Sequence, residues 1–289
     1  MADWPKGPYR WQVDDVLYVS IPFTWNLPTV RAELQQGSWL WNRAVVGGPA
    51  TRLMPDYLAG VDGVTVGDTM PGILQRVNLL ATRTSIGCPR KCAFCGVRVF
   101  EPEFAELDDW PDLPIICDNN LMACSLQHIE RVCYRLAKWE GVDFNQGLDA
   151  RLMTDDHARL LAIIPKAKCR MSCDSIREQD DIAEAAGLMQ AAGIPKSRMP
   201  IYALIAFDTD PQECWTRLLW LEAQHFTVCP MWYHALDCLQ WNTVTDAQKA
   251  LGWSDKERTR IMGYFYKRRG MVPDFSTNGG EIACAGGGK

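Results

Sequence analysis

Three cysteines in one short segment carry the clearest chemical signal of this sequence. Cys88, Cys92 and Cys95 stand in the run GCPRKCAFCG with CxxxCxxC spacing, and thiolates so spaced can surround one metal centre. A structural zinc site takes four protein ligands, usually as two separated pairs, and no second CxxC or Cys/His pair follows at suitable spacing. A four-iron cluster on three cysteines keeps one iron without a protein ligand. An electron carrier normally fills that position with a fourth Cys, whereas an enzyme leaves it open to a substrate or cofactor.

The other nine of the twelve cysteines are scattered in apolar or helical surroundings. The N-terminus, Met1 to Trp11, has neither the basic cluster nor the apolar run of an export signal, so we expect a cytoplasmic protein without a disulfide framework. Most of the nine are expected to be small buried side chains. For Cys238 and Cys284 the alternative to burial is ligation of a second iron–sulfur cluster. The remaining seven are Cys117, Cys124, Cys133, Cys169, Cys173, Cys214 and Cys229.

A repeated pattern of strand, turn and helix begins near residue 80 and places the cysteine segment directly after a strand. Ser125, Thr154 and Asp210 are predicted to cap three of the intervening helices. Each helix must return the chain so that the next strand runs in the same direction, which predicts a parallel sheet, either open or curled into a barrel. The six predicted strands are Leu80 to Ile86, Ile115 to Asp118, Val142 to Asn145, Lys168 to Cys173, Pro200 to Ala206 and Thr227 to Met231.

The carboxyl ends of parallel strands are where ligands gather in both kinds of sheet. For the polar residues at these ends, turn formation or helix capping is the alternative use, because Asn, Asp and Ser favour such places. This edge is predicted to carry Cys88, Asp118, Asn119, Asn145, Gln146, Asp174, Ser175, Asp208 and Tyr233.

Two smaller segments flank this region. Residues 12 to 79 read as a short α/β piece with strands at 16–21, 44–46 and 61–66 and a helix at 28–36, expected to pack on the main sheet. A capping-box pattern from Ser254 to Glu257 predicts a helix that runs to Gly270, followed by a glycine-rich tail. The predicted division is therefore 1–79, 80–236 and 237–289.

The composition is that of a soluble globular protein. Of 289 residues 47% are hydrophobic and 22% charged, with a net charge of −5, which excludes disorder for most of the chain. No stretch approaches the roughly 18 consecutive apolar residues of a membrane span. The mildly acidic total argues against wholesale binding of a phosphate backbone.

The cysteine segment resembles the cluster loop of the radical S-adenosylmethionine (radical SAM) superfamily. The resemblance rests on the spacing, on Phe94 directly before the third cysteine, on Gly87 and Gly96, and on the preceding strand, and covers roughly residues 80 to 235. It implies an α/β fold with a partial (βα)6 TIM-like barrel, a [4Fe-4S] cluster on the three cysteines, and S-adenosylmethionine on the open iron. It further implies reductive cleavage of that cofactor to methionine and a 5′-deoxyadenosyl radical, which removes a hydrogen atom from the substrate.

Other roles implied by the resemblance are carried over one residue at a time. Phe94 belongs to the cofactor loop. Asp118 or Asn119, where the family often has Gly-Gly-Glu, is expected to contact the methionine amino group of S-adenosylmethionine. Gln146, with Asn145, Asp149 and Arg151, is expected to face the substrate or the cofactor carboxylate, and Asp174 or Ser175 the ribose hydroxyls.

The resemblance also implies partners. A one-electron donor such as a flavodoxin or ferredoxin is expected, for which Arg90 and Lys91 are a candidate contact. A fainter likeness joins residues 44–68 to the cobalamin-binding domain of one branch of the superfamily, but the segment is short and has no histidine, so bound cobalamin is not expected. No membrane partner is expected.

The substrate prediction rests on the helix near the C-terminus. A nucleic-acid base or nucleotide is the first substrate class, because this helix interleaves aromatic with basic residues; a solvated helix is the alternative. A peptide is the second class, and a non-catalytic iron–sulfur or zinc module is the competing kind of protein. The residues concerned are Lys256, Arg258, Arg260, Tyr264, Phe265, Tyr266, Lys267, Arg268 and Arg269.

Overall fold

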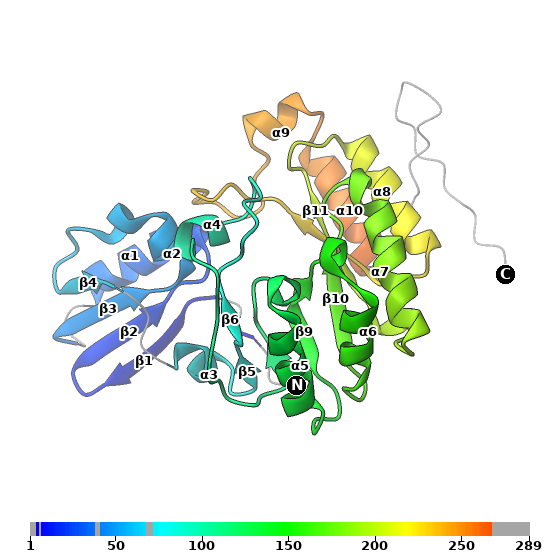
Figure 1. Cartoon of the computed structure of the whole chain (residues 1–289). Helices are drawn as coiled ribbons and strands as arrows, with labels where there is room; N and C mark the ends of the chain where they lie inside the picture. Colours follow the sequence, from blue (N-terminus) through cyan, green and yellow to red (C-terminus); the bar gives the residue numbers. More distant parts are fainter. Residues whose placement is uncertain (1–3, 6, 38–40, 68–71, 268–289) are drawn as a thin grey trace. The chain divides into compact units, whose positions relative to one another are not determined.

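The computed structural model describes residues 4, 5, 7–37, 41–67 and 72–267, which form parts of two compact units (Figure 1). The first unit comprises Met1–Asn119 and His234–Trp241, and the second Asn120–Tyr233 and Asn242–Lys289. This division falls inside the predicted core region, and the predicted boundaries at 79 and 236 stay a prediction. Arg268, Arg269, Cys284, the predicted helix end at Gly270 and the tail lie outside the described residues.

The first unit begins with a four-stranded sheet in the order β1-β2-β3-β4. Strands β2 (Val16–Ser20), β3 (Arg43–Gly47) and β4 (Val64–Val66) run parallel, as the sequence predicts. Strand β4 is shorter than predicted because the Val64 N–H donates to the Val61 carbonyl in a turn. Strand β1 (Tyr9–Val13), which pairs antiparallel with β2, was not predicted, although its residues alternate between apolar and polar side chains.

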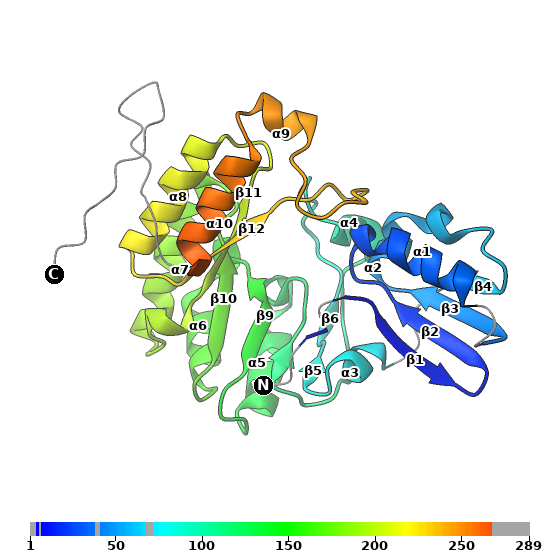
Figure 2. The same cartoon turned by 180° about the vertical axis from the view of Figure 1, so that it is seen from behind.

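This sheet has a hydrophobic core of its own. Helix α1 (Leu27–Gln36), which Figure 2 shows beside the sheet, contributes Leu27, Val30 and Leu34 to it. Strands β2 and β3 contribute Val19 and Val46. The short helix α2 (Pro49–Leu53) and a 3-10 turn, Pro55–Leu58, complete the layer. Residues 12 to 79 therefore bury apolar surface among themselves.

The remainder of the first unit holds the predicted strand 80–86, which is split in two. Strand β5 (Ala81–Thr82) pairs parallel with β8 (Ile115–Ile116), whereas β6 (Ser85–Ile86) pairs antiparallel with β7 (Ala105–Glu106). The chain changes partner at the residues between, where the Thr84 carbonyl accepts the Leu107 N–H. Helix α3 (Ile73–Val77) precedes β5, and α4 (Val97–Phe100) follows the cysteine segment.

The second unit contains the other four predicted strands as a parallel sheet in the order β12-β11-β10-β9. Their bounds are Asp143–Leu148 for β9, Lys168–Ser172 for β10, Ile201–Ile205 for β11 and Val228–Trp232 for β12. Helices α5 (Leu126–Leu136), α6 (Asp155–Ala162), α7 (Gln179–Ala191) and α8 (Pro211–Ala223) lie along one side of these strands (Figures 1 and 2). The predicted α/β class with parallel strands is thus observed.

Local signals in the sequence place three of these helices correctly. The side chains of Ser125, Thr154 and Asp210 each accept a backbone N–H at the start of α5, α6 and α8. Two helices follow β12, namely α9 (Asp246–Ala250) and α10 (Asp255–Lys267), and the Ser254 hydroxyl accepts the Glu257 N–H at the start of α10. No helix in the described part of the chain is both long and apolar enough to cross a membrane.

Candidate functional site

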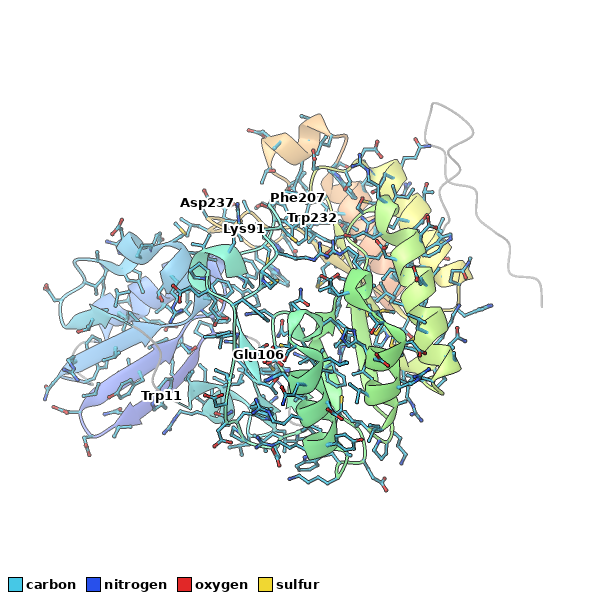
Figure 3. All side chains as sticks on the ribbon, in the orientation of Figure 1. Trp11, Lys91, Glu106, Phe207, Trp232 and Asp237 are labelled. Carbon is cyan, nitrogen blue, oxygen red and sulfur yellow. The ribbon has the colours of Figure 1, made fainter. Side chains whose placement is uncertain are left out.

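The three predicted metal-ligating cysteines lie between β6 and β7, on a segment that includes α4 and is called here the cysteine loop (residues 88–100). Cys88, Cys92 and Cys95 are all partly exposed. The Cys95 N–H donates to the Cys92 carbonyl at 3.1 Å, and Arg98 donates to the Ala93 carbonyl at 3.1 Å, so the loop is folded on itself. Figure 3 labels Lys91 in this loop and Glu106 in β7, just beyond its end.

The scattered cysteines are different in kind. Cys117, Cys124, Cys133, Cys169, Cys173 and Cys214 are buried, which confirms the prediction for most of that set. Burial raises the pKa of the Cys133, Cys169 and Cys173 thiols to about 12. A thiol with so high a pKa is neutral and a poor metal ligand. Among the scattered cysteines that the structure describes, Cys229 and Cys238 are partly exposed, like the three of the cysteine loop.

The base of the cysteine loop is closed by backbone geometry. Strand β6 leads into the loop and β7 follows its return, with Ser85 paired to Glu106 and Ile86 to Ala105. Gly87, at the start of the loop, has φ +67°, and a Cβ there would lie 1.9 Å from the Glu103 carbonyl oxygen. Only glycine allows this close approach of the two chain segments.

A carboxylate joins the two ends of the loop. Glu101 lies directly after α4, and its carboxylate accepts hydrogen bonds from both Nη atoms of Arg83, at 2.6 and 2.5 Å. It also accepts hydrogen bonds from the Gly87 N–H at 3.2 Å and from Asn119 Nδ2 at 2.6 Å. Burial by itself raises the pKa of Glu101, but the hydrogen bonds and charge of Arg83, with the Gly87 and Asn119 donors, hold it below its ordinary value. Glu101 is therefore an ionised acceptor at neutral pH.

Asp118, a predicted cofactor contact, is buried, with 3% of its surface exposed. Its carboxylate accepts the backbone N–H groups of Thr84 and Ser85, at 2.6 and 2.9 Å, and the Thr84 hydroxyl at 2.5 Å. Burial raises the pKa of Asp118, and these donors oppose the rise. The side chain therefore ties the end of β8 to the turn that precedes the cysteine loop.

Gln146, Asp174 and Ser175 belong to the second unit. Gln146 is exposed in a bulge of β9, where the pairing with β10 shifts and Gly147 has φ +96°. The Ser175 hydroxyl accepts the Arg177 N–H at the start of a 3-10 turn, Ile176–Glu178, so this serine caps a helical turn. The Asp174 carboxylate accepts the Leu204 N–H at 3.0 Å, and burial raises its pKa to about 6.

Hydrogen bonds join Asn120, Asp149, Arg151, Glu178 and Asp174. The buried Asp149 accepts Arg151 Nε at 2.7 Å and Asn120 Nδ2 at 3.2 Å. Arg151 also donates to Glu178, whose other oxygen accepts the Asp174 N–H at 2.6 Å. The Asn145 carbonyl accepts the Tyr202 hydroxyl at 3.4 Å. The structure thus links the ends of β9 and β10, as the parallel-sheet argument predicts.

The three-cysteine donor set fits an iron–sulfur cluster by its chemistry. It offers three partly exposed thiols on one loop whose ends are held together. In the described residues no group of three or more His, Cys, Asp and Glu side chains is arranged to hold a metal ion, so a cluster on this loop requires the three thiols to move closer together. Among the same residues, Thr82 Oγ1, Arg83 Nε and Ser85 Oγ are buried without a hydrogen-bond partner. Buried hydrogen-bonding groups at the base of the loop thus have no partner in the described part of this structure.

Sequence reasoning missed Arg83, Thr84 and Glu101. Arg83 and Glu101 have opposite charges on either side of the cysteine segment, but charged residues in loops are common and this pairing alone carries no signal. It is the pairing of β6 with β7 that brings them together.

The basic and aromatic residues of α10 mostly serve packing. Arg258 and Arg260 pair with Asp255 and Glu257, and their guanidinium groups lie over the rings of Trp232 and Trp215. The hydroxyl groups of Tyr264 and Tyr266 donate to Glu222 and to the Pro230 carbonyl. The structure thus gives these side chains intramolecular partners.

Comparison with known proteins gives a likeness of fold. No model of a protein family matches this sequence, and no curated protein matches it. The fold is similar to that of TsrM, a radical S-adenosylmethionine methyltransferase from Kitasatospora setae, in a structure with cobalamin and a [4Fe-4S] cluster bound. The TM-score is 0.54 at 11% identity, over 76% of this chain and 62% of TsrM. The chain thus spans less than two thirds of TsrM, and the likeness concerns the fold.

Proposed function

We propose that this chain is a radical SAM enzyme with a [4Fe-4S] cluster on Cys88, Cys92 and Cys95. The observation that carries the proposal is the position of the cysteine loop: three partly exposed thiols follow the end of β6 in an α/β chain whose fold resembles that of a radical SAM methyltransferase. A partial (βα)6 barrel is part of the proposal. When bound, the cluster supplies the electron that cleaves S-adenosylmethionine to methionine and a 5′-deoxyadenosyl radical.

The residues of the chain have distinct parts in this proposal. Cys88, Cys92 and Cys95 hold the cluster, and Phe94 is a proposed contact to the cofactor. Asp118 acts indirectly, since its carboxylate is occupied by Thr84 and Ser85. Asn119, Gln146 and Asp174 remain proposed contacts to the cofactor, as does Ser175, whose hydroxyl accepts the Arg177 N–H and can still donate its proton to a ribose oxygen.

For the substrate and the electron donor we propose only a chemical class. A nucleic-acid base or nucleotide stays the first substrate class and a peptide the second, and a flavodoxin or ferredoxin the donor. We propose no bound cobalamin, because the cobalamin-like segment, residues 44–68, is short and contains no histidine that could serve as the lower cobalt ligand.

Anaerobic purification followed by iron and sulfide analysis tests the function. We expect a brown protein whose absorption changes with S-adenosylmethionine and which releases 5′-deoxyadenosine under dithionite. A triple Cys88→Ser, Cys92→Ser, Cys95→Ser variant should lose all three properties, and the partly exposed Cys229→Ser is the matched control. Bound zinc without colour, or iron and colour without the nucleoside, would reject the enzyme in favour of a structural or electron-transfer module. Cobalt analysis and the cobalamin spectrum test that cofactor separately.

A further inference from the structure

We propose that Glu101 is the positioning residue of the cysteine loop, with Arg83 as its partner. Together they hold the two ends of the loop in place before any cluster binds. That the bound group is an iron–sulfur cluster rests on the proposed function, whereas the pinning of the loop rests on the geometry of the protein alone.

A single carboxylate connects the start and the end of the loop. The chain enters the loop at Gly87, whose N–H donates to Glu101 Oε2 at 3.2 Å, and leaves it at Glu101 itself. The same oxygen accepts Arg83 Nη2 at 2.5 Å and Asn119 Nδ2 at 2.6 Å, and Oε1 accepts Arg83 Nη1 at 2.6 Å. Glu101 therefore ties the loop to the residues following both β5 and β8.

The backbone elements at this base are short. Strands β6 and β7 pair over two residues each, and α4 has four residues. Pairing and helices this short are marginal without further contacts. The Arg83 and Glu101 side chains are 24% and 20% exposed, so water screens their attraction less than that of a surface pair.

Pinned ends matter for a site built from three ligands on one loop. A loop whose ends are already joined loses less conformational entropy when its ligands converge on one group. Loss of the Glu101 carboxylate should therefore loosen the loop in the metal-free protein and weaken retention of a cluster, while the sheet and helix cores stay intact.

Limited trypsin digestion of the metal-free full chain tests the pinning directly, because Arg90 and Lys91 lie inside the loop. We expect cleavage there to be at least tenfold faster in Glu101→Ala than in the unmodified chain. Glu101→Gln, which keeps one oxygen for the Gly87 N–H, should lie between. The control is Glu33→Ala, which removes another Arg–Glu pair, the more exposed Arg10–Glu33 contact between β1 and α1. Cleavage of Glu101→Ala at the unmodified rate would overturn the inference.

Cluster retention is the second measurement, with the urea midpoint of each variant as the check on folding. After anaerobic reconstitution with iron and sulfide, Glu101→Ala should lose iron to a chelator at least tenfold faster than the unmodified chain. Its reduced cluster should give an altered electron paramagnetic resonance spectrum, and Glu101→Gln should restore part of both properties. If Glu101→Ala does not fold, Arg83→Lys, which keeps the charge without the planar fork, takes its place.

The two proposals fail in different ways. If the unmodified chain takes up no iron, the proposed function is wrong, and the trypsin contrast still decides whether Glu101 pins the loop. If the unmodified chain holds a cluster and Glu101→Ala holds it equally well with the same spectrum, the function stands and the positioning role of Glu101 is wrong.

Discussion

Replacement of Asp118 by alanine tests how the chain holds the turn that leads into the cysteine loop. The carboxylate accepts two backbone N–H groups and the Thr84 hydroxyl, and the site is closed to water. Two buried backbone donors left unpaired cost about 1–3 kcal/mol each, and the hydroxyl can turn to another partner. Because burial raises the pKa of Asp118, the ionised form carries a desolvation penalty that alanine removes, which offsets part of this cost. We expect a net loss of about 3 kcal/mol.

Urea unfolding of the metal-free protein, followed by tryptophan fluorescence, measures this loss, and hydrogen exchange at Thr84 and Ser85 locates it. Asp118→Asn keeps an oxygen for both backbone donors, so it should cost less than about 1 kcal/mol. The exposed Asp62→Ala should change stability by less than about 0.5 kcal/mol. A stability of Asp118→Ala within that margin of the unmodified chain, with unchanged exchange at Thr84 and Ser85, would refute the clamp.

Three further predictions test other parts of the structure. Asp174 has a pKa of about 6 in the folded chain against an ordinary value of 3.8, so folding takes up a proton between these values and stability falls as pH rises through them. Asp174→Asn should abolish this fall, worth at most about 3 kcal/mol, in urea unfolding at pH 4, 5, 6 and 7; an unchanged pH dependence would contradict it. Arg170 is paired with Asp143, and both side chains are largely buried. Arg170→Met should therefore lower stability by about 3 kcal/mol, and the double variant Arg170→Met, Asp143→Leu should lose less because no buried carboxylate is left unpaired. An equal or greater loss of stability in the double variant would argue against an uncompensated Asp143 as the cause. Gly87→Ala should lower stability by more than about 2 kcal/mol and speed hydrogen exchange at Ile86, because its Cβ would meet the Glu103 carbonyl oxygen. The control Gly187→Ala, inside α7 and with open space around it, should raise the thermal midpoint slightly. Similar effects at both glycines would refute the close approach at Gly87.

Much of the fold was predictable because its signals are local. Ser125, Thr154 and Asp210 mark helix starts through hydrogen bonds to residues three positions on, and that spacing is visible in the sequence. The predicted strands at 168–173 and 200–206 match β10 and β11 to within one residue at each end. Strand β1 was missed although its residues alternate between apolar and polar side chains. The split of 80–86 into β5 and β6 was missed because a change of pairing partner leaves no mark in the local sequence pattern.

The candidate site was likewise predictable from the sequence only where its signals are local. The cysteines were identified because their spacing is itself the signal. Ser175 was expected either to contact a ribose or to cap a turn, and the structure shows the cap; the ribose contact stays a prediction. Asp118 was expected to face a cofactor, and its three donors in Thr84 and Ser85 come from a segment more than thirty residues earlier in the chain.

The amino-acid sequence by itself determined the α/β class, the starts of α5, α6, α8 and α10, and the group of three cysteines, because each depends on residues within a few positions of one another. Only the tertiary structure decided that Glu101 reaches Gly87 and Arg83, and that Asp118 is a buried clamp. Those contacts join residues 14 to 34 positions apart. Which donor meets which carboxylate at such a separation depends on strand pairing and burial, and these are properties of the folded chain as a whole.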